Sequence, residues 1–427
     1  MKIFPLYNIA FSASLASTAY VFALMGGEDS PIALLAVQAM VLLLPGLSLF
    51  TKGYKRINRN NLLLWAVVSI SLLLNLLVNI GNYPAGPVTV GFVVAHMVGI
   101  VGILFAIQWA ATNLSSETLM RHLAIFLFPL IALAIVATLQ DGGWTSRAAP
   151  FDIHPNWWGE LCFAFTACAL ALHGKKAKAL LIGAAMILFF LVQARGALLA
   201  ACVCIGVYIF FSMKQRRQKK TGPLLIITAI IFAGVILAMQ QATVLQAWIF
   251  LKGDVLLLDN SYRGLDTGLT GRLEGWHQAL SIFAENPIFG QGLDTLNEVH
   301  NGFLRLAGEG GLLLLLPILF MMGMAVYQSL KNRNYLALSV LFGYAVYALT
   351  YPRMLNMNLA SAIFYLCVFY WPKNSSTAKQ RIHEQTERND PVVSDARRLP
   401  SVDAALVRVS PPTRYRTSPR IINDSSA

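Results

Sequence analysis

This chain of 427 residues has little charge: Asp, Glu, Lys and Arg make up 12% of it, whereas hydrophobic residues make up 56%. A soluble globular domain typically carries about 25% charged residues, because water must solvate its surface. The composition therefore excludes an ordinary soluble protein and indicates a membrane protein.

The chain also lacks the patterns of a metal site or a disulfide framework. Its five cysteines all lie inside apolar runs: Cys162, Cys168, Cys202, Cys204 and Cys367. None has zinc-ligand spacing in a polar segment, and apolar runs of this kind do not form a disulfide scaffold. The sequence has no Asp-x-Asp pair and no cluster of histidines and carboxylates, so we expect no metal.

Negative charge is scarcer than positive charge, and the formal net charge is +13. A nucleic-acid-binding protein would gather its cations into a basic patch or stripe. Here the cations stand in short clusters between apolar runs, which is typical of the loops of a membrane protein. We therefore expect membrane lipid, and no nucleic acid, among the partners.

Long apolar runs are abundant. A helix needs about 20 apolar residues to cross roughly 30 Å of hydrocarbon, and its backbone groups must pair within the helix. The sequence predicts an all-α polytopic membrane protein with about twelve transmembrane helices. The predicted spans are 5–25, 31–50, 61–80, 88–112, 120–140, 157–173, 178–193, 196–213, 222–241, 303–328, 335–350 and 356–372.

Lys and Arg are distributed unequally between alternate loops. With a cytoplasmic N-terminus, the inner loops hold Lys52, Lys55, Arg56, Arg59, Arg121, Lys175, Lys176, Lys178, Lys214, Arg216, Arg217, Lys219, Lys220, Lys331 and Arg333. The outer loops hold only Arg147, Arg195, Lys252, Arg263, Arg272 and Arg353. Because an excess of cations marks the cytoplasmic side, we predict that both termini are cytoplasmic.

Two segments outside the predicted spans differ from the rest. Residues 242–302 form the one large loop on the outer side. Residues 373–427 are rich in Lys, Arg, Ser and Pro and show no helical or strand period, which is typical of a disordered tail. We therefore divide the chain into a transmembrane domain, 1–372, and a disordered basic cytoplasmic tail, 373–427.

The outer loop ends in a polar passage rich in glycine. Apolar residues recur at helical spacing from Gly271 to Glu285, which predicts a short amphipathic helix at the membrane surface. A glycine-rich turn follows, and His300 and Asn301 open the tenth span.

His300 is the candidate catalytic residue. The N-terminus of a helix carries a partial positive charge that suits a phosphate group. A histidine at that position can accept a proton from a sugar hydroxyl. A lone histidine tolerated at a membrane interface is the alternative, but the polar segment beside His300 favours the catalytic interpretation.

The passage GR-x3-W-x8-9-NP-x2-G-x-G, followed by the His-Asn dipeptide, resembles the O-antigen ligase and polymerase superfamily of bacterial inner-membrane proteins. The ligases share a signature of His, then Asn, Ser or Gln, nine residues, Gly, two residues, and Gly, Thr or Tyr. His300, Asn301 and Gly311 match this signature, and Leu314 departs from it at the last position. The passage QARG at 193–196 is similar to the family's arginine-bearing motif between the seventh and eighth spans.

The resemblance implies a glycosyltransferase that takes a glycan from undecaprenyl diphosphate and passes it to lipid A–core at the periplasmic face. It implies neither nucleotide sugar nor metal nor other cofactor, so cations of the protein must neutralise the departing diphosphate. Guanidinium groups bind phosphate oxygens bidentately. The predicted substrate-binding residues are Arg195, Arg272, Asn301 and Arg353, and His300 is the predicted general base.

Other charged residues near His300 have open interpretations. Asp294 and Glu298 are both candidates to orient His300 through a hydrogen bond, and their spacing does not choose between them. Arg305 and Glu309 stand four positions apart in the tenth span, so we expect them to pair on one helix face.

Four functions are compatible with these patterns. They are ligation of a lipid-linked glycan to lipid A–core, polymerisation of such glycans, protein O-glycosylation, and transport or flipping without bond chemistry. A polymerase often carries two sizeable outer loops, whereas here the loop 141–156 is short, so ligation is favoured. A transporter is disfavoured because the sequence has no matching pair of Gly- or Pro-broken spans.

Overall fold

The computed structural model describes residues 4–24, 31–49, 59–83, 87–140, 149–215, 270–296, 299–351, 354–355 and 358–369. The chain divides into two compact units, Met1–Ser375 and Ser376–Ala427. The second unit, and with it the predicted tail, lies outside the described residues. So do the predicted ninth span, 222–241, and residues 242–269 of the large loop, and these expectations stay predictions.

Every regular element in the described part of the chain is a helix, and no strand occurs there. The α-helices are α1 (Phe4–Leu24), α2 (Pro31–Leu49), α3 (Arg59–Asn79), α4 (Pro87–Asn113), α5 (Ser116–Gln140), α6 (Pro155–Leu170), α7 (Lys175–Val192), α8 (Arg195–Gln215), α11 (Thr270–Glu285), α12 (Gly302–Lys331), α13 (Tyr335–Thr350) and α14 (Leu359–Phe369). Two 3-10 turns are η1 (Ile80–Asn82) and η2 (Pro150–Asp152). Eleven predicted spans coincide with α1 to α8 and α12 to α14, which confirms the all-α class.

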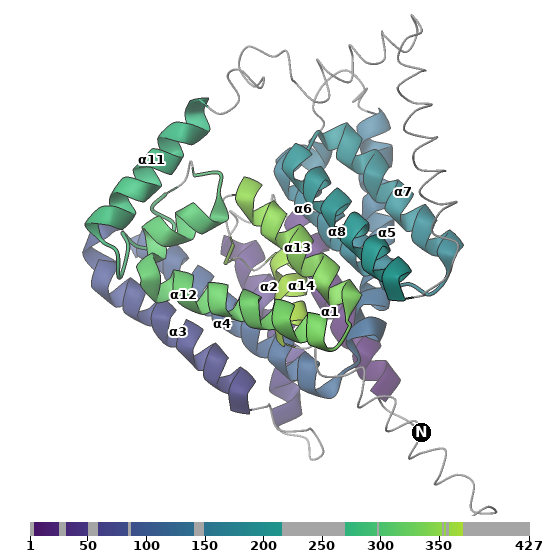
Figure 1. Ribbon diagram of the computed structural model, residues 1–427, viewed down its shortest axis with the longest axis horizontal. Helices are drawn as coiled ribbons and strands as arrows, with labels where there is room; N and C mark the ends of the chain where they lie inside the picture. The colour runs from purple at the N-terminus through teal and green to yellow at the C-terminus, as the bar shows by residue number, and fades with distance from the viewer. Residues whose placement is uncertain are drawn as a thin grey trace, which may run out of the picture. The chain divides into compact units, whose positions relative to one another are not determined.

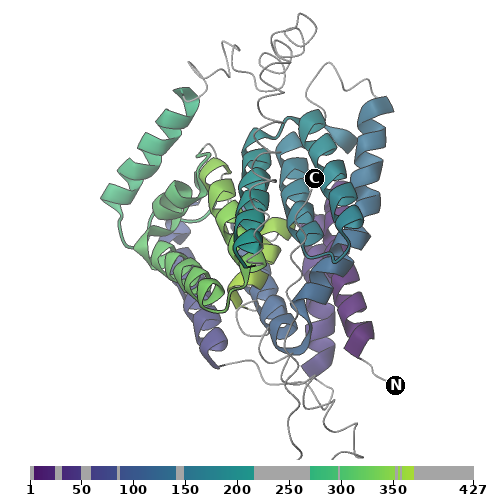
Figure 2. The same ribbon diagram turned by 45° about the vertical axis from the view of Figure 1, so that its right-hand side comes forward.

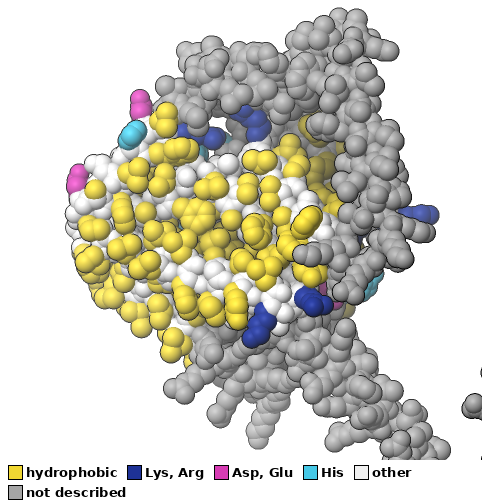
Figure 3. Space-filling model, in the orientation of Figure 1, with side chains coloured by type: hydrophobic (Ala, Val, Ile, Leu, Met, Phe, Trp, Pro, Cys, Tyr) yellow, Lys and Arg dark blue, Asp and Glu magenta, His cyan; other side chains and the backbone are white. Residues whose placement is uncertain are grey.

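The helices have the length and composition of membrane spans. Stretches long and apolar enough to cross a bilayer are Tyr7–Leu24, Leu62–Asn82, Val93–Asn113, Ser116–Gln140, Arg195–Ser212 and Gly302–Lys331, and α13 and α14 are shorter apolar helices. Figure 3 shows a face covered by hydrophobic side chains, with Lys and Arg at its upper and lower margins. Leu63 on α3 and Phe320 on α12 are 62% and 61% exposed. Such a face suits lipid rather than water, and the chain is a polytopic membrane protein.

The centre of the first unit is formed by α6 and α14, whose residues are almost all buried. A helix that is hydrophobic all round belongs in the interior. α6 packs against α5, α7 and α8, and α14 packs against α4, α6, α12 and α13 (Figures 1 and 2). α12 additionally contacts α3 and α11, so it joins the core to the outer segment.

The amphipathic helix predicted from Gly271 to Glu285 is present as α11, which packs on α12. Its packing face is formed by the buried Ala279 with the partly buried Trp276 and Ile282, whereas Leu273 and Leu280 are exposed. A Cβ atom on Gly308 would lie 3.2 Å from the carbonyl oxygen of Ala279. The two helix backbones come so close here that only small residues, Ala279 on α11 and Gly308 on α12, fit between them.

Candidate active site

The first candidate feature is a break in α12 at Gly311. The φ and ψ angles of Gly311 are 59° and −162°, so the helical hydrogen bonds cannot continue through it. The amide of Leu312 donates to the carbonyl oxygen of Pro287 at 2.8 Å, and that of Leu313 donates to Ile288 at 3.0 Å. The helix thus takes its hydrogen-bond acceptors at this point from the outer segment.

The same break frees two carbonyl groups of the helix for the outer segment. The amide of Gln291 donates to Gly308 and that of Gly292 donates to Glu309, both at 2.9 Å. Each of these carbonyls would otherwise accept from an amide four residues later in the helix. Four backbone hydrogen bonds therefore fasten the turn 287–292 into the break, so no backbone group involved is left unsatisfied.

Glycine is required on both sides of this junction. A Cβ atom on Gly311 would lie 2.3 Å from the carbonyl oxygen of Ile288, and one on Gly290 would lie 2.5 Å from that of Gly308. Both glycines also have positive φ angles, of 59° and 63°. The glycines of the family motifs thus serve close packing between two backbones.

Asparagine side chains of α3 and of the 3-10 turn η1 that follows it bind the same junction from its other side. The side-chain amide of Asn75 donates to the carbonyl oxygens of Phe289 and Glu309, at 2.6 and 3.0 Å. That of Asn82 donates to Gln291 at 3.1 Å. Sequence reasoning missed these residues. The available signal was the spacing of Asn75, Asn79 and Asn82 on one face of an apolar helix.

His300 precedes the first residues of α12 and is partly buried. Asn301, next to it, is the N-cap residue: its Oδ1 accepts from the amides of Phe303 and Leu304, at 3.1 and 3.2 Å. This arrangement is the usual way in which Asn satisfies the free amides of a helix start. The structure thereby confirms that the His-Asn dipeptide opens the helix.

Arg195 is the first residue of α8. The preceding helix, α7, ends at Val192, and its C-cap residue, Gln193, has a left-handed φ of 52° that turns the chain sharply into α8. A Cβ atom on Gly196 would lie 2.4 Å from Oγ1 of Thr350, so the start of α8 is pressed against the end of α13. Glu160 of α6 is 2% exposed and lies beside Tyr347 of α13.

The end of α13 also contacts the start of α12. A Cβ atom on Gly302 would lie 3.2 Å from the carbonyl oxygens of both Ala348 and Tyr351. The helix starts that follow Arg195 and His300 therefore pack on the last turn of the same helix. These contacts bring the two predicted site residues, which are far apart in the sequence, to the same end of α13.

The other two predicted arginines are Arg272 and Arg353. Arg272 lies in the first turn of α11, about two turns before the contact between Ala279 and Gly308. Arg353 and Glu298 lie outside the described residues. The structure therefore tests neither the role of Arg353 nor the choice between Asp294 and Glu298.

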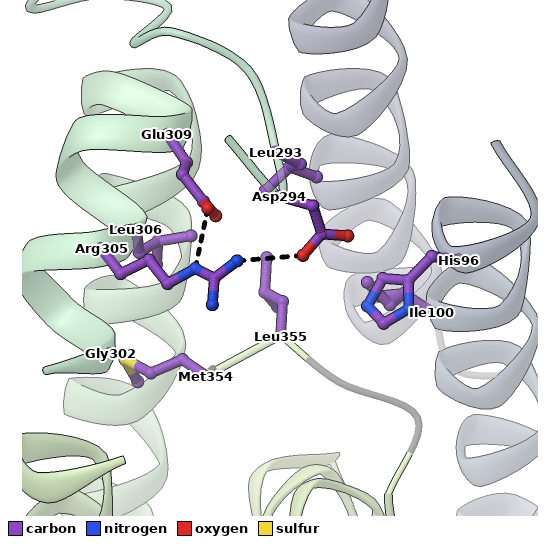
Figure 4. Close-up of a pocket in the computed structure, with 10 residues that line it drawn as sticks. All are labelled: His96, Ile100, Leu293, Asp294, Gly302, Arg305, Leu306, Glu309, Met354 and Leu355. Atoms are coloured by element: carbon purple, nitrogen blue, oxygen red, sulfur yellow. Dashed lines mark hydrogen bonds and ion pairs between the residues drawn. The ribbon is translucent and has the colours of Figure 1, made fainter. Parts of the chain in front are cut away.

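A buried ionic cluster joins α12 to the loop that precedes it (Figure 4). The Nε of Arg305 donates to Oε1 of Glu309 at 2.7 Å, and its Nη2 donates to Oδ1 of Asp294 at 3.0 Å. The expected pairing of Arg305 with Glu309 is confirmed. Asp294 is an addition that sequence spacing could not supply, because it comes from the loop rather than from the helix. Figure 4 shows Asp294 between Arg305 and His96 of α4.

The cluster lines a pocket together with apolar groups. The pocket is bounded by His96, Ile100, Leu293, Asp294, Gly302, Arg305, Leu306, Glu309, Met354 and Leu355. Nearby, Tyr83 is 7% exposed. Burial and the charges of Glu309 and Asp294 raise the pKa of Tyr83 to about 12, so its hydroxyl stays protonated at neutral pH.

In the part of the chain that the structure describes, no three or more His, Cys, Asp or Glu side chains are grouped so that they could hold a metal ion.

Residues 179–319 match the family model described as O-antigen ligase. The matched range includes Arg195, Arg272, His300 and Asn301, and it contains the break at Gly311. No curated protein matches the chain. The family match supports the superfamily that the sequence motifs predict.

Proposed function

Because the chain carries an O-antigen ligase domain over residues 179–319, we propose that it transfers a glycan from undecaprenyl diphosphate to lipid A–core. The reaction takes place at the periplasmic face of the bacterial inner membrane. The observation that supports this proposal most is the meeting of the Arg195 and His300 helix starts on the last turn of α13. The proposed cation for the diphosphate and the proposed base for the acceptor thus lie at the same end of α13.

The proposed reaction is a displacement at the anomeric carbon of the donor glycan. His300 accepts the proton of an acceptor hydroxyl, whose oxygen forms the new bond to that carbon. The bond between the carbon and the diphosphate oxygen breaks, and undecaprenyl diphosphate leaves with the bonding electron pair. Arg195, Arg272 and Arg353 hold the diphosphate and stabilise its developing negative charge. No metal takes part.

Asn301 has a narrower role in this proposal. Its Oδ1 accepts from the amides of Phe303 and Leu304, so its contribution to substrate binding falls to the side-chain amide nitrogen. The helix cap also sets the position of His300, the residue directly before it. Asn301 thereby links acceptor activation to the start of α12.

Polymerisation and protein O-glycosylation use the same bond chemistry with other acceptors. The lipopolysaccharide of a deletion strain distinguishes ligation from these two alternatives. If the chain is the ligase, the deletion strain lacks all long chains on lipid A–core and accumulates undecaprenyl-linked polymer. Core bearing a single repeat would instead identify a polymerase. Unchanged lipopolysaccharide would contradict both ligation and polymerisation. Complementation with the wild-type chain, but not with His300→Ala, assigns the effect to transfer.

A further inference from the structure

The loop that carries His300 is closed at its base by ionic contacts. Arg305 binds Asp294, which is eleven positions earlier in the chain, and Glu309, which is four positions later. The side chains of Arg305 and Glu309 are 4% and 5% exposed, and that of Asp294 is 14% exposed. Buried ionic groups of this kind hold their geometry firmly, because separating them would leave an uncompensated charge.

A second fastening lies closer to His300 on its N-terminal side. The amide of Leu296 donates to Oε1 of Glu309 at 3.0 Å. Leu296 and Val299 are 2% and 0% exposed and pack with Ala279 of α11. The chain that leads into His300 is therefore held both by the ionic cluster and by apolar packing.

The chain that leaves His300 is held as well. Asn301 caps α12, and the amide of Arg305 donates to the carbonyl oxygen of Asn301 at 2.8 Å. Arg305 thus stands one helical turn after the cap while its side chain reaches back to Asp294, before His300. The ionic contact between Arg305 and Asp294 closes a loop that has His300 within it.

Arg305 itself is unsuited to hold the substrate diphosphate. Two carboxylates already accept hydrogen bonds from its guanidinium group, and the charges of the cluster sum to one negative charge when all three groups are ionised. An anionic diphosphate would be repelled rather than bound there. Arg305 therefore acts through the geometry of the loop, in contrast to Arg195 and Arg272.

We propose that Asp294, Arg305 and Glu309 are positioning residues that hold the His300 loop in the geometry needed for glycan transfer. This inference rests on the proposed function. A guanidinium group is required because two of its nitrogen atoms bind two different carboxylates at once. A lysine in this place would keep the charge but not the fixed fork.

The test compares Arg305→Lys with the wild-type chain in lipid nanodiscs. Hydrogen exchange of peptides covering 294–305 is measured together with transfer from undecaprenyl-diphosphate-linked glycan to purified lipid A–core. We expect faster exchange and a kcat lower by about tenfold or more, since small misplacements of a catalytic group are costly. The KM for the donor stays unchanged because the proposed diphosphate ligands are intact.

Arg121→Lys is the matched control. Arg121 also pairs with a glutamate four positions away, Glu117, and its guanidinium group has a second acceptor, the carbonyl oxygen of Ala171. It lies on α5, away from the His300 loop. This variant is expected to leave exchange over 294–305 and kcat as in the wild type.

Asp294→Asn provides a second variant that leaves the pair of Arg305 and Glu309 in place. Asp294 has a φ of 61°, which asparagine tolerates well. Loss of the Asp294 charge weakens the contact with Arg305 that closes the loop. Hydrogen exchange should therefore rise and kcat should fall, and both changes should be smaller than in Arg305→Lys. This variant also decides the question if Arg305→Lys does not fold.

The outcomes separate the inference from the proposed function. Unchanged exchange over 294–305 in both variants overturns the inference whatever the activity is. Faster exchange with an unchanged kcat overturns it too, because the contacts would then stabilise the fold without positioning His300. A wild-type chain that transfers no glycan overturns the proposed function, and exchange alone then decides whether the cluster holds the loop.

Discussion

At the scale of single residues, the start of α12 assigns different tasks to two neighbouring polar side chains. Asn301 satisfies the amides of Phe303 and Leu304, two of the groups that would otherwise attract a phosphate at a helix N-terminus. In the proposed mechanism the diphosphate therefore depends on arginine side chains more than on the helix start. His300 stands directly before this cap residue.

Replacing His300 tests its role as the base. We expect His300→Ala to lower the rate of transfer by about 10²–10⁴, the usual contribution of a general base, and to leave donor binding intact. His300→Asn should be equally impaired, because an amide forms hydrogen bonds but does not accept the proton. The measurement is transfer by the purified variants, and a wild-type rate in His300→Asn would end the proposal of a general base.

The proposed diphosphate ligands are tested by separate alanine variants. Arg195→Ala and Arg272→Ala should each abolish transfer while the protein still inserts into the membrane. Lysine at either position should rescue only partly, because a point charge lacks the bidentate geometry. Arg121→Ala serves as the control for loss of an arginine. Near-normal transfer in a membrane fraction by both alanine variants would remove these arginines from the mechanism.

At the scale of elements, the broken helix α12 explains how a polar segment is held against the membrane domain. The break at Gly311 exchanges helical hydrogen bonds for bonds to the turn 287–292. Asn75 of α3 adds hydrogen bonds to carbonyl groups on both partners. Backbone polar groups within a bilayer need such partners because lipid offers none.

Alanine substitutions in α12 test the junction. Gly311→Ala should lower the free energy of unfolding by about 1–3 kcal/mol, because its Cβ atom would lie 2.3 Å from the carbonyl oxygen of Ile288 and its φ is positive. Gly323 of the same helix has nothing within 4 Å of an added Cβ atom. Gly323→Ala should therefore be neutral or slightly stabilising.

Thermal unfolding of the two variants in detergent is the measurement. The expected result is a lower midpoint for Gly311→Ala only, accompanied by faster hydrogen exchange at 287–292. Equal midpoints for the two variants would show that the junction contributes nothing to stability.

At the scale of the whole molecule, the distribution of Lys and Arg and the directions of the helices are both consistent with one proposed active face. The helix starts at Arg195 and His300 and the end of α13 meet at one end of the bundle. The lysines at the start of α7, Lys175 and Lys176, stand one helix length away from that end. This is the arrangement expected if cations mark the cytoplasmic side and transfer occurs on the other.

Reporter fusions test this orientation. A reporter that is active only outside the cytoplasm should be active when fused at Thr270 and silent when fused at Asn334. The expected difference follows from the excess of Lys and Arg in alternate loops. Activity at Asn334 with silence at Thr270 would reverse the orientation and remove the proposed periplasmic reaction.

The sequence by itself determined the helices and where most of them begin. Apolar length predicts a span because hydrocarbon leaves the backbone no partner outside its own helix, and eleven predicted spans have their helices. The same local physics predicted the helix start after His300 and the pairing of Arg305 with Glu309, since residues four apart share a helix face.

Only the tertiary structure decided which distant groups meet. Asp294 reaches Arg305 from a loop, Asn75 reaches the junction from α3, and Ala279 rather than Leu273 or Leu280 lies in the face of α11 that packs on α12. Spacing along a chain constrains contacts within one or two helical turns. It does not determine which helix a face packs against, because that depends on how closely the backbones approach across the whole bundle.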